Sequence, residues 1–296
     1  MRLIRKLAKQ LGAYWRDRLK QKRLKNYHFN GNIPWAIGYE DYKFDQINAA
    51  LSNKDLLVEF SQGTLPPSYG VGLDERIVEI PWLWSRLNAE KGRLLDAGSS
   101  LNHQFLIDSR LYESKEIAIY TYYPENTQFL AERISYVFGD LRTMPFKDSW
   151  FDEIACISTI EHIDKDNSIY GYQVDDIAKS QTKSYEYLKA IAEMVRILRP
   201  GGRILMTFPF GIFEDHGFFQ QFDQEMVDRL DTLFSSSGQV KYDYLSYTKS
   251  GWQFSEADKC SNAKSFNPHT GIGKGNDGAA HSRAICCIEF TKSGLN

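Results

Sequence analysis

The expected fold is organised around the stretch Gly92–Ser100, with the sequence GRLLDAGSS. Its part Arg93–Leu95 has the apolar character of a short buried strand, which we expect to end at Asp96. The small residues Ala97–Ser100 follow, and a helical run is expected over 103–111. Strand, small-residue turn and helix build a nucleotide pocket in open α/β sheets, but they also form ordinary strand-to-helix turns. Because this turn holds a single glycine, the stretch alone leaves both interpretations open.

The composition indicates a soluble globular protein of one large or two small domains. The 296 residues are 42% hydrophobic and 25% charged, and the net charge of −2 argues against nucleic acid as the main partner. The sequence has neither the run of about 18 apolar residues that a membrane span needs nor a signal-peptide pattern, so we expect a cytoplasmic protein. The four cysteines show neither zinc spacing nor a disulfide framework.

Residues 1–26 are strongly basic, with ten Lys or Arg and a single acid, Asp17. Apolar residues, among them Trp15 and Leu19, recur at helical spacing between the basic ones. The pattern predicts a basic amphipathic helix, which suits contact with an anionic membrane surface. A solvated helix packed loosely on the domain and a partner-binding arm are the alternatives.

Residues 27–90 predict a helical lead-in that covers the sheet and the mouth of its pocket. Apolar spacing predicts one helix over 44–60, and the segment 62–72, rich in proline and glycine, predicts a loop. A second helix is expected to begin with Asp74 as its N-cap and to be bent by Pro81.

Residues 91–296 alternate between strand-like and helix-like segments. Further strands are expected over 116–120, 134–138, 151–157 and 203–208, a short helix over 127–133, and a long helix over 185–198 that Arg199–Gly202 ends. Alternating strands and helices give parallel pairing, so we predict a doubly wound α/β sheet. After Pro209, a helix over 222–234 and two strands over 240–247 and 283–291 are expected, the strands as an antiparallel hairpin at a sheet edge.

Four motifs in this domain resemble the class I S-adenosylmethionine-dependent methyltransferases, in particular those of type 11. They are LLDAGSS at 94–100, GDLRTMPF at 139–146, FDEIACISTIEHI at 151–163 and LRPGGRILMTFP at 198–209. Each motif is modest evidence, and their common order and spacing carry the resemblance. It implies S-adenosylmethionine as cofactor and a seven-stranded, mostly parallel sheet in the order 3-2-1-4-5-7-6, with the last strand antiparallel.

The resemblance also implies which residues hold the cofactor. The turn after the first strand would receive the methionine and ribose end, with Asp96 fixing the turn or orienting the methionine amino group. Asp140 matches the acid that contacts the adenine amino group in the family, and Ser158 begins the floor where cofactor and acceptor meet. The expected cofactor-binding residues are Asp96, Ala97, Gly98, Ser99, Glu125, Asp140, Leu141 and Ser158.

Two departures from the family pattern concern the cofactor. Ser100 and Asn102 stand near the places where the first turn usually has further glycines. The second strand lacks the acid that binds the ribose hydroxyls, because Tyr120–Tyr123 occupies its end and Glu125 comes later. Either Glu125 or nearby hydroxyls replace that acid, or cofactor binding is weak or lost.

Methyl transfer to a hydroxyl needs a base, and histidine is the natural one near neutral pH. His162, beside Glu161, and His216, in the loop after the fifth strand, are the candidates, although the Glu161–His162 pair also has a structural explanation. Four phenylalanines of this region either wall a ring-shaped acceptor or pack in the core: Phe213, Phe218, Phe219 and Phe222.

The acids near His162 are expected to be solvated loop residues, so no metal is predicted. The segment 164–184 is longer than a normal strand-to-helix link and is a candidate lid or acceptor-selecting insertion.

The sequence therefore predicts an S-adenosylmethionine-dependent methyltransferase that acts at oxygen on a small-molecule or saccharide acceptor. The alternative is a catalytically reduced binding or scaffold protein that keeps the fold, which the missing ribose acid favours. A nicotinamide-dependent oxidoreductase shares the fold type, but both its glycine fingerprint and its ribose acid are missing. The expected organisation is the helix 1–26, the lead-in 27–90 and the catalytic domain 91–296.

Overall fold

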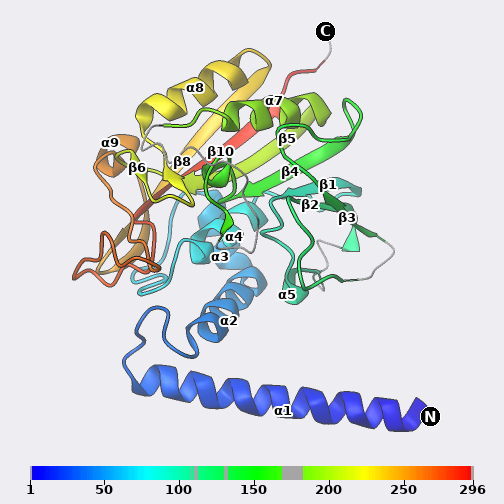
Figure 1. Ribbon diagram of the computed structural model, residues 1–296, viewed down its shortest axis with the longest axis vertical. Coiled ribbons are helices and arrows are strands. Elements are labelled where there is room, and N and C mark those ends of the chain that lie inside the picture. The colour runs from blue at the N-terminus through cyan, green and yellow to red at the C-terminus, as the bar shows by residue number, and fades with distance from the viewer. Residues whose placement is uncertain (1, 108, 110–112, 130–132, 169–182, 295–296) are drawn as a thin grey trace.

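A twisted sheet with helices on both faces forms the body of the protein (Figure 1). The computed structural model describes residues 2–107, 109, 113–129, 133–168 and 183–294. The strand order in the sheet is β3-β2-β1-β4-β5-β10-β8-β9. Its strands are β1 (Gly92–Ala97), β2 (Lys115–Thr121), β3 (Ile134–Phe138), β4 (Phe151–Ile157), β5 (Leu198–Pro209), β8 (Gly238–Thr248), β9 (Gly251–Ser255) and β10 (Ala284–Lys292).

The pairing confirms the expected doubly wound sheet. Strands β1 to β5 pair in parallel, and β10 runs antiparallel to both β5 and β8. The strand count was wrong, because β9 adds an eighth strand through a tight antiparallel turn before Gly251. A separate two-stranded sheet, β6 (Glu214–Asp215) with β7 (Gln220–Gln221), lies in the loop after β5.

Successive residues of β4 serve two different hydrophobic clusters, as the pleat of a strand requires. Ile154 and Cys156 pack with α7 (Tyr187–Ile197) and α8 (Gln224–Ser235), whereas Ala155 and Ile157 pack with the helices of the lead-in on the opposite face. Both faces of the sheet are therefore covered, which is why its central strands are apolar throughout.

The long helix before β5 ends earlier than predicted. α7 ends at Ile197 and Leu198 already belongs to β5, so no glycine caps the helix. The Pro-Gly-Gly segment lies instead at the start of β5, where the pairing with β4 is irregular and Gly201 has a φ of +73°.

The lead-in forms three helices, α2 (Tyr39–Ser52), α3 (Lys54–Ser61) and α4 (Arg76–Trp84), instead of the predicted two. The single helix expected over 44–60 is wrong because Asn53 has an extended backbone and caps α3, its Oδ1 accepting the N–H groups of Asp55 and Leu56. Asp74 lies just before the start of α4, where its Oδ1 accepts the N–H of Arg76. Pro81 lies inside α4 without ending it.

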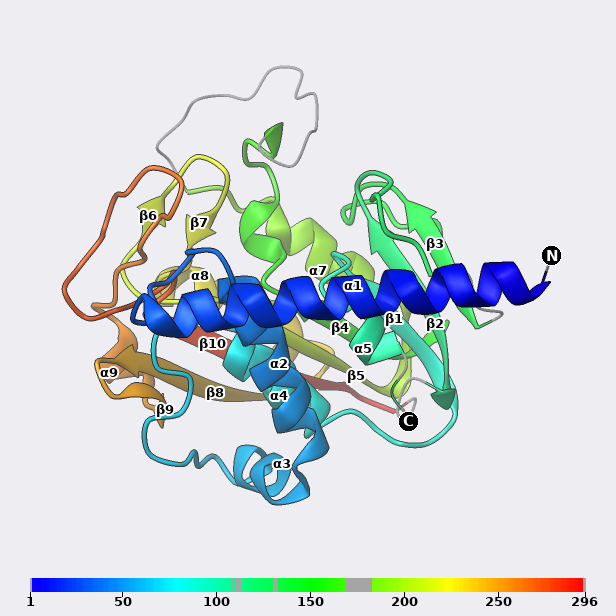
Figure 2. The same cartoon turned by 90° about the horizontal axis from the view of Figure 1, so that it is seen from below.

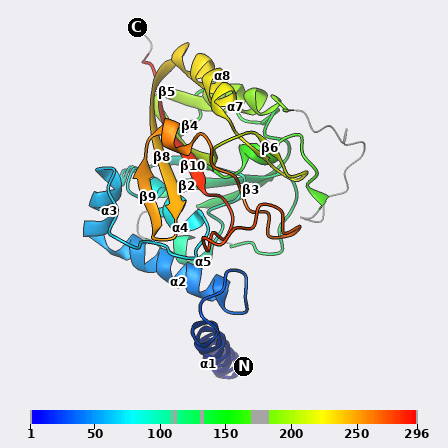
Figure 3. The same ribbon diagram turned by 90° about the vertical axis from the view of Figure 1, so that its left-hand side faces the viewer.

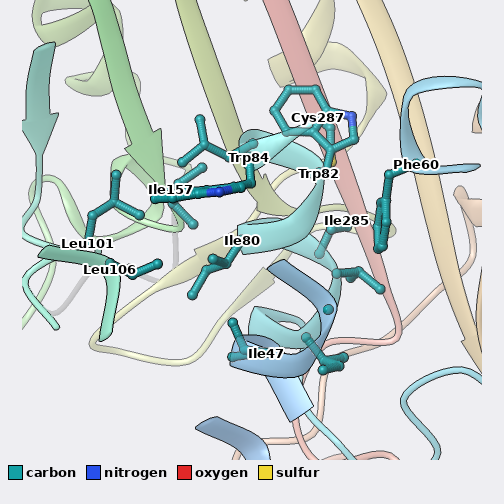
Figure 4. Close-up of a cluster of buried hydrophobic side chains, with 14 of the residues drawn as sticks. Ile47, Phe60, Ile80, Trp82, Trp84, Leu101, Leu106, Ile157, Ile285 and Cys287 are labelled. Atoms are coloured by element: carbon teal, nitrogen blue, oxygen red, sulfur yellow. The ribbon is translucent and has the colours of Figure 1, made fainter. Parts of the chain in front are cut away.

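The helices expected after β1 and β2 fall only partly on described residues. α5 (Gln104–Ile107) has a single turn and 127–129 are not helical, whereas 108, 110–112 and 130–132 lie outside the described residues. α4 packs on this face instead, with contacts to β4 and β5. Figure 4 shows Ile80, Trp82 and Trp84 of α4 between residues of the sheet and residues of α2 and α3. The lead-in thus covers the sheet, as expected.

α1 (Arg2–Phe29) runs three residues beyond the predicted 26 and lies at the periphery (Figures 2 and 3). Its C-terminal half is tied to α2 by the ion pairs Lys20–Asp45 and Arg23–Asp41, the second at 2.6 Å. Trp15 remains 58% exposed. Among the described residues, no helix is long and apolar enough to cross a membrane.

A buried carboxylate joins α4 to the sheet. Oε1 of Glu79 accepts hydrogen bonds from Ser158 Oγ (2.5 Å) and Thr207 Oγ1 (2.7 Å), and Oε2 accepts one from Arg76 Nη1 (2.6 Å). Glu79 has no exposed surface. Because Ser158 follows β4 and Thr207 lies in β5, this one side chain fixes the lead-in against two strand ends.

We expect the substitution Glu79→Ala to lower the free energy of unfolding by about 3 kcal/mol, because it leaves a partly buried guanidinium and two buried hydroxyls without their acceptor. Denaturant titration measures this loss. The exposed Glu90→Ala is the control and should change stability by about 0.5 kcal/mol or less. A loss of less than about 1 kcal/mol for Glu79→Ala would show that the carboxylate does not hold the lead-in.

Candidate functional site

The candidate site lies beyond the carboxyl ends of β1 and β4. The chain order of the strands reverses between these two, since β1 pairs with β2 on one side and with β4 on the other. Open α/β sheets bind ligands at this switch point. Three predicted groups of residues meet here: the turn after β1, the turn after β4 and the loop after β5.

The turn after β1 has a left-handed backbone at Gly98 (φ +112°) and Ser99 (φ +63°). A Cβ on Gly98 would lie 2.1 Å from Thr159 Oγ1, so the turns after β1 and β4 touch there. The N–H of Gly98 donates to the carbonyl of Tyr120 (2.8 Å). One glycine is enough for this turn because only this position has no room for a side chain. β1 itself continues through Asp96 to Ala97, beyond its predicted end.

Asp96 is completely buried, and only one of its two carboxylate oxygens has a hydrogen-bond partner among the described residues. Its Oδ2 accepts the N–H of Leu101 (3.1 Å), whereas its Oδ1 has no hydrogen-bond partner among the described residues. Burial raises the pKa of Asp96 to about 7. The buried Oγ of Ser99 also lacks a partner within the described part of the chain. Asp96 Oδ1 and Ser99 Oγ, at the end of β1, can therefore form hydrogen bonds with a ligand or with water.

Glu125 lies next to this turn although it comes four residues after β2. Its Oε2 accepts a hydrogen bond from Asn102 Nδ2 (3.0 Å), and Asn102 Oδ1 accepts one from Tyr136 on β3 (3.0 Å). The charge of Glu125 adds to the effect of burial on the pKa of Asp96. Asn102, near one of the places where further glycines are expected, is thus hydrogen-bonded to Glu125, the candidate replacement for the missing acid. Tyr122 and Tyr123, which occupy the expected position of the acid, are both largely exposed.

Asp140 and Leu141 follow β3 on the other side of β2. The guanidinium of Arg142 binds both carboxylate oxygens of Asp140, with Nη2 2.7 Å from Oδ2. Burial favours the protonated form of Asp140, but these hydrogen bonds outweigh it and hold the pKa below its ordinary value. Tyr120 of β2 donates to the Asp140 carbonyl (3.1 Å), and Leu141 is half-buried beside it.

Ser158 has a left-handed backbone (φ +39°) and donates its hydroxyl to Glu79, so this hydroxyl is already engaged. The 3-10 helix η1 (Ile160–His162) follows and carries Glu161 and His162. Glu161 is buried, and its Oε2 has no partner among the described residues. Burial raises the pKa of Glu161 well above its ordinary value.

The two predicted catalytic histidines are brought together around Phe219. His216 stacks on Phe219 with ring centroids 4.4 Å apart, and His162 lies 6.2 Å from the same ring. His162 Nδ1 is 2.7 Å from the carbonyl oxygen of Phe218, and burial lowers the pKa of His162 to about 4. Burial also lowers the pKa of His216, whose Nε2 lies 3.5 Å from Glu214 Oε2.

The four phenylalanines divide between core and loop. Phe222 is fully buried against Phe208 and Tyr187, so it packs in the core. Phe218 keeps 9% of its surface exposed and stacks on His162, and Phe213 is half-buried.

Sequence reasoning missed the charged groups that α4 and its N-terminus bring to the site. Besides Arg76 and Glu79, Glu75 pairs with His281 (2.9 Å), which lies 5.1 Å from the ring of Phe219. The available signal was a glutamate inside an otherwise apolar helical run, IVEIPWLW, where a charge is costly without a partner.

A hydrogen bond joins the two ends of the candidate lid, since Ser184 Oγ donates to Asp164 Oδ2 (2.7 Å). Its central residues 169–182 lie outside the described residues. Within the described ranges, no three His, Cys, Asp or Glu side chains are grouped so that they could hold a metal ion.

Chemically, the site offers unpaired acceptors at one end and aromatic rings with histidines at the other. The Asp96 carboxylate and Ser99 hydroxyl can receive the polar end of a cofactor. Burial lowers the pKa of His162 and of His216, so these two histidines are the groups that can take a proton from an acceptor.

One family model matches part of the chain. It is described as a methyltransferase domain and covers residues 112–206, a span that includes β2, β3, β4 and the larger part of β5. No curated protein is significantly similar to the chain.

Several solved structures are similar at low sequence identity. The 1,6-didemethyltoxoflavin-N1-methyltransferase of Burkholderia thailandensis, with bound 1,6-didemethyltoxoflavin and S-adenosylhomocysteine, is 12% identical (TM-score 0.40; 83% of this chain and 88% of that one). An S-adenosylmethionine-dependent methyltransferase of Methanosarcina mazei is also 12% identical (TM-score 0.41; 72% and 98%). The [4+2]-cyclase SpnF is 16% identical (TM-score 0.42; 70% and 76%). Likeness this remote indicates neither substrate nor reaction.

The raised pKa of Asp96 predicts a specific pH dependence of stability. Folding raises this pKa from about 4 to about 7, so the folded protein binds the extra proton and stability falls as the pH rises through this window. The free energy of unfolding of the wild type should fall between about pH 5 and about pH 8. In Asp96→Asn, whose side chain cannot ionise, this fall should be smaller by about 2 kcal/mol. Urea titrations at both pH values measure the difference, with the exposed Asp17→Asn as control. An unchanged pH dependence in Asp96→Asn would contradict the burial of an ionisable carboxyl.

Proposed function

We propose that this chain, which carries a class I S-adenosylmethionine-dependent methyltransferase domain, transfers the methyl group of S-adenosylmethionine to a hydroxyl oxygen of a small acceptor. The observation that supports this most is the unpaired, buried Oδ1 of Asp96 beside the left-handed turn at Gly98 and Ser99. The α-ammonium group of the methionine moiety is a donor that suits this oxygen. In this proposal the small turn would receive the ribose end of the cofactor.

Glu125 is the group that we propose to bind the ribose hydroxyls in place of the missing acid. Its tie to Asn102 supports this role, because it holds the carboxylate beside the first turn and within electrostatic reach of Asp96. On the other side of β2, Asp140 would receive the adenine amino group, with the backbone of Leu141 beside it. Arg142 would fix the orientation of the Asp140 carboxylate for this contact.

A hydroxyl acceptor is supported by the groups around Phe219. The hydrogen bond to the Phe218 carbonyl requires the proton of His162 on Nδ1, so Nε2 carries the lone pair that could act as base. His216 is the second candidate, since burial keeps it neutral at working pH. The flat faces of Phe218 and the histidines would accommodate a ring, and we therefore propose a small or saccharide-type acceptor.

We also propose that α1 contacts an anionic membrane surface. The exposed Tyr14, Trp15 and Leu19 lie on a helix rich in Lys and Arg, a combination typical of interfacial helices. Equal binding to anionic vesicles by the full chain and by a chain without residues 1–26 would contradict this role.

Titration calorimetry with S-adenosylhomocysteine tests the cofactor assignment. We expect binding by the wild type and about 10-fold weaker binding by Glu125→Gln, because hydrogen bonds to a charged carboxylate are lost. Glu116→Gln, which changes a largely exposed acid on β2, is the matched control and should bind like the wild type. A wild-type protein that does not bind this ligand would support the scaffold alternative.

Release of S-adenosylhomocysteine from S-adenosylmethionine, measured over a panel of hydroxylated and amine acceptors, tests the acceptor class. Turnover with monosaccharides or phenols and its loss in His162→Asn or His216→Asn would support methylation at oxygen. Turnover with amines alone would contradict it.

A further inference from the structure

Arg76 has an unusual position in the lead-in. Of the residues from Leu73 to Trp84, every one is buried except Arg76, whose side chain is 28% exposed. It is the first residue of α4, at the end of the helix that faces the turns after β1 and β4. The exposed part of Arg76 is therefore the one place where this buried segment reaches solvent.

The guanidinium of Arg76 has hydrogen-bonding capacity to spare. In the described part of the chain its side chain donates one hydrogen bond, from Nη1 to Glu79 Oε2. A guanidinium carries five N–H donors in a planar fork. The remaining donors, among them those of Nε and Nη2, are available to a further acceptor.

The charge of Arg76 acts on both halves of the site. Burial raises the pKa of Asp96 and of Glu161, and the charge of Arg76 opposes this rise. Burial lowers the pKa of His103 and of His162, and the charge of Arg76 lowers both further. Arg76 is hydrogen-bonded to Glu79, which also holds Ser158 at the start of the turn after β4. That turn touches the turn after β1, where a Cβ on Gly98 would meet Thr159. Arg76 therefore lies close to both the turn proposed to hold the methionine moiety and the proposed acceptor side.

The acidic side chains around Arg76 are bound by other groups or favour the neutral form, so an anionic ligand can still bind Arg76. Glu75 is paired with His281, and Asp74 is paired with Lys43 (2.8 Å). Glu79 is shared by Arg76 and two hydroxyls, and burial favours the neutral form of Glu161. An incoming carboxylate thus meets a cation with free donors, while an ammonium group beside it would meet the unpaired Oδ1 of Asp96.

We propose that Arg76 binds the α-carboxylate of the cofactor's amino-acid moiety, so that Arg76 and Asp96 together recognise an α-amino-acid zwitterion. This inference rests on the proposed function and extends it to the lead-in, because α4 then supplies a ligand-binding residue as well as a cover for the sheet. A fork-shaped guanidinium suits a carboxylate better than the point charge of lysine does.

Two ligands that differ by the amino-acid moiety test this role in the full chain. Calorimetry compares S-adenosylhomocysteine with 5′-methylthioadenosine, which has the same adenosine but no amino acid. We expect Arg76→Gln to weaken S-adenosylhomocysteine binding about 10- to 100-fold and to change 5′-methylthioadenosine binding less than about 3-fold. Arg76→Lys should restore part of the affinity, since it keeps the charge but not the fork. Arg199→Gln, at an exposed arginine on β5, is the control.

The outcomes separate the two claims. If Arg76→Gln weakens both ligands equally, or neither, the carboxylate assignment is overturned while the proposed function stands. 5′-Methylthioadenosine reports on the adenosine site, so a variant that fails to fold is recognised because it binds neither ligand and has a lowered melting temperature. In that case Arg76→Lys is the deciding variant. A preference for S-adenosylhomocysteine equal to that of the wild type supports the assignment, and loss of this preference overturns it. If the wild type binds neither ligand, the proposed function itself fails.

Discussion

The buried carboxylate of Glu79 is the interaction on which the arrangement of the site depends. It joins three segments that are far apart in sequence, because its acceptor atoms are shared by Arg76, Ser158 and Thr207. Burying a carboxylate is costly unless donors surround it, so the requirement of Glu79 for partners fixes the positions of α4, the turn after β4 and β5 relative to one another. Through Ser158, the same contact sets where Glu161 and His162 lie.

The same hydrogen bonds of Glu79 make the lead-in part of the candidate site. Among the described residues after β1, α5 has a single turn. α4 packs on this face of the sheet, with buried apolar side chains and the charged residues Arg76 and Glu79. The family model matches only 112–206, yet the site also draws on α4 and on the turn after β1, which precede the match.

The sequence was sufficient where local patterns decide the structure. β4 has the bounds that its apolar run predicts, and the order of strands follows from alternation and the family motifs. It was insufficient where long-range contacts decide. The break at Asn53 depends on a single capping side chain in a continuous apolar pattern. Two of the partners of Glu79, Ser158 and Thr207, lie 79 and 128 residues away, and the hydrogen bond between Asn102 and Glu125 joins two loops, so no local periodicity reveals either contact.

The central claim is that the ends of β1 and β4 and the start of α4 form one cofactor site. Amide hydrogen exchange, with and without S-adenosylhomocysteine, tests it most directly. We expect slower exchange on ligand addition in 74–80, 96–102 and 158–163 together, and unchanged exchange in the β8–β9 hairpin at 238–255. Protection confined to the hairpin, or protection of 96–102 without 74–80 and 158–163, would contradict it.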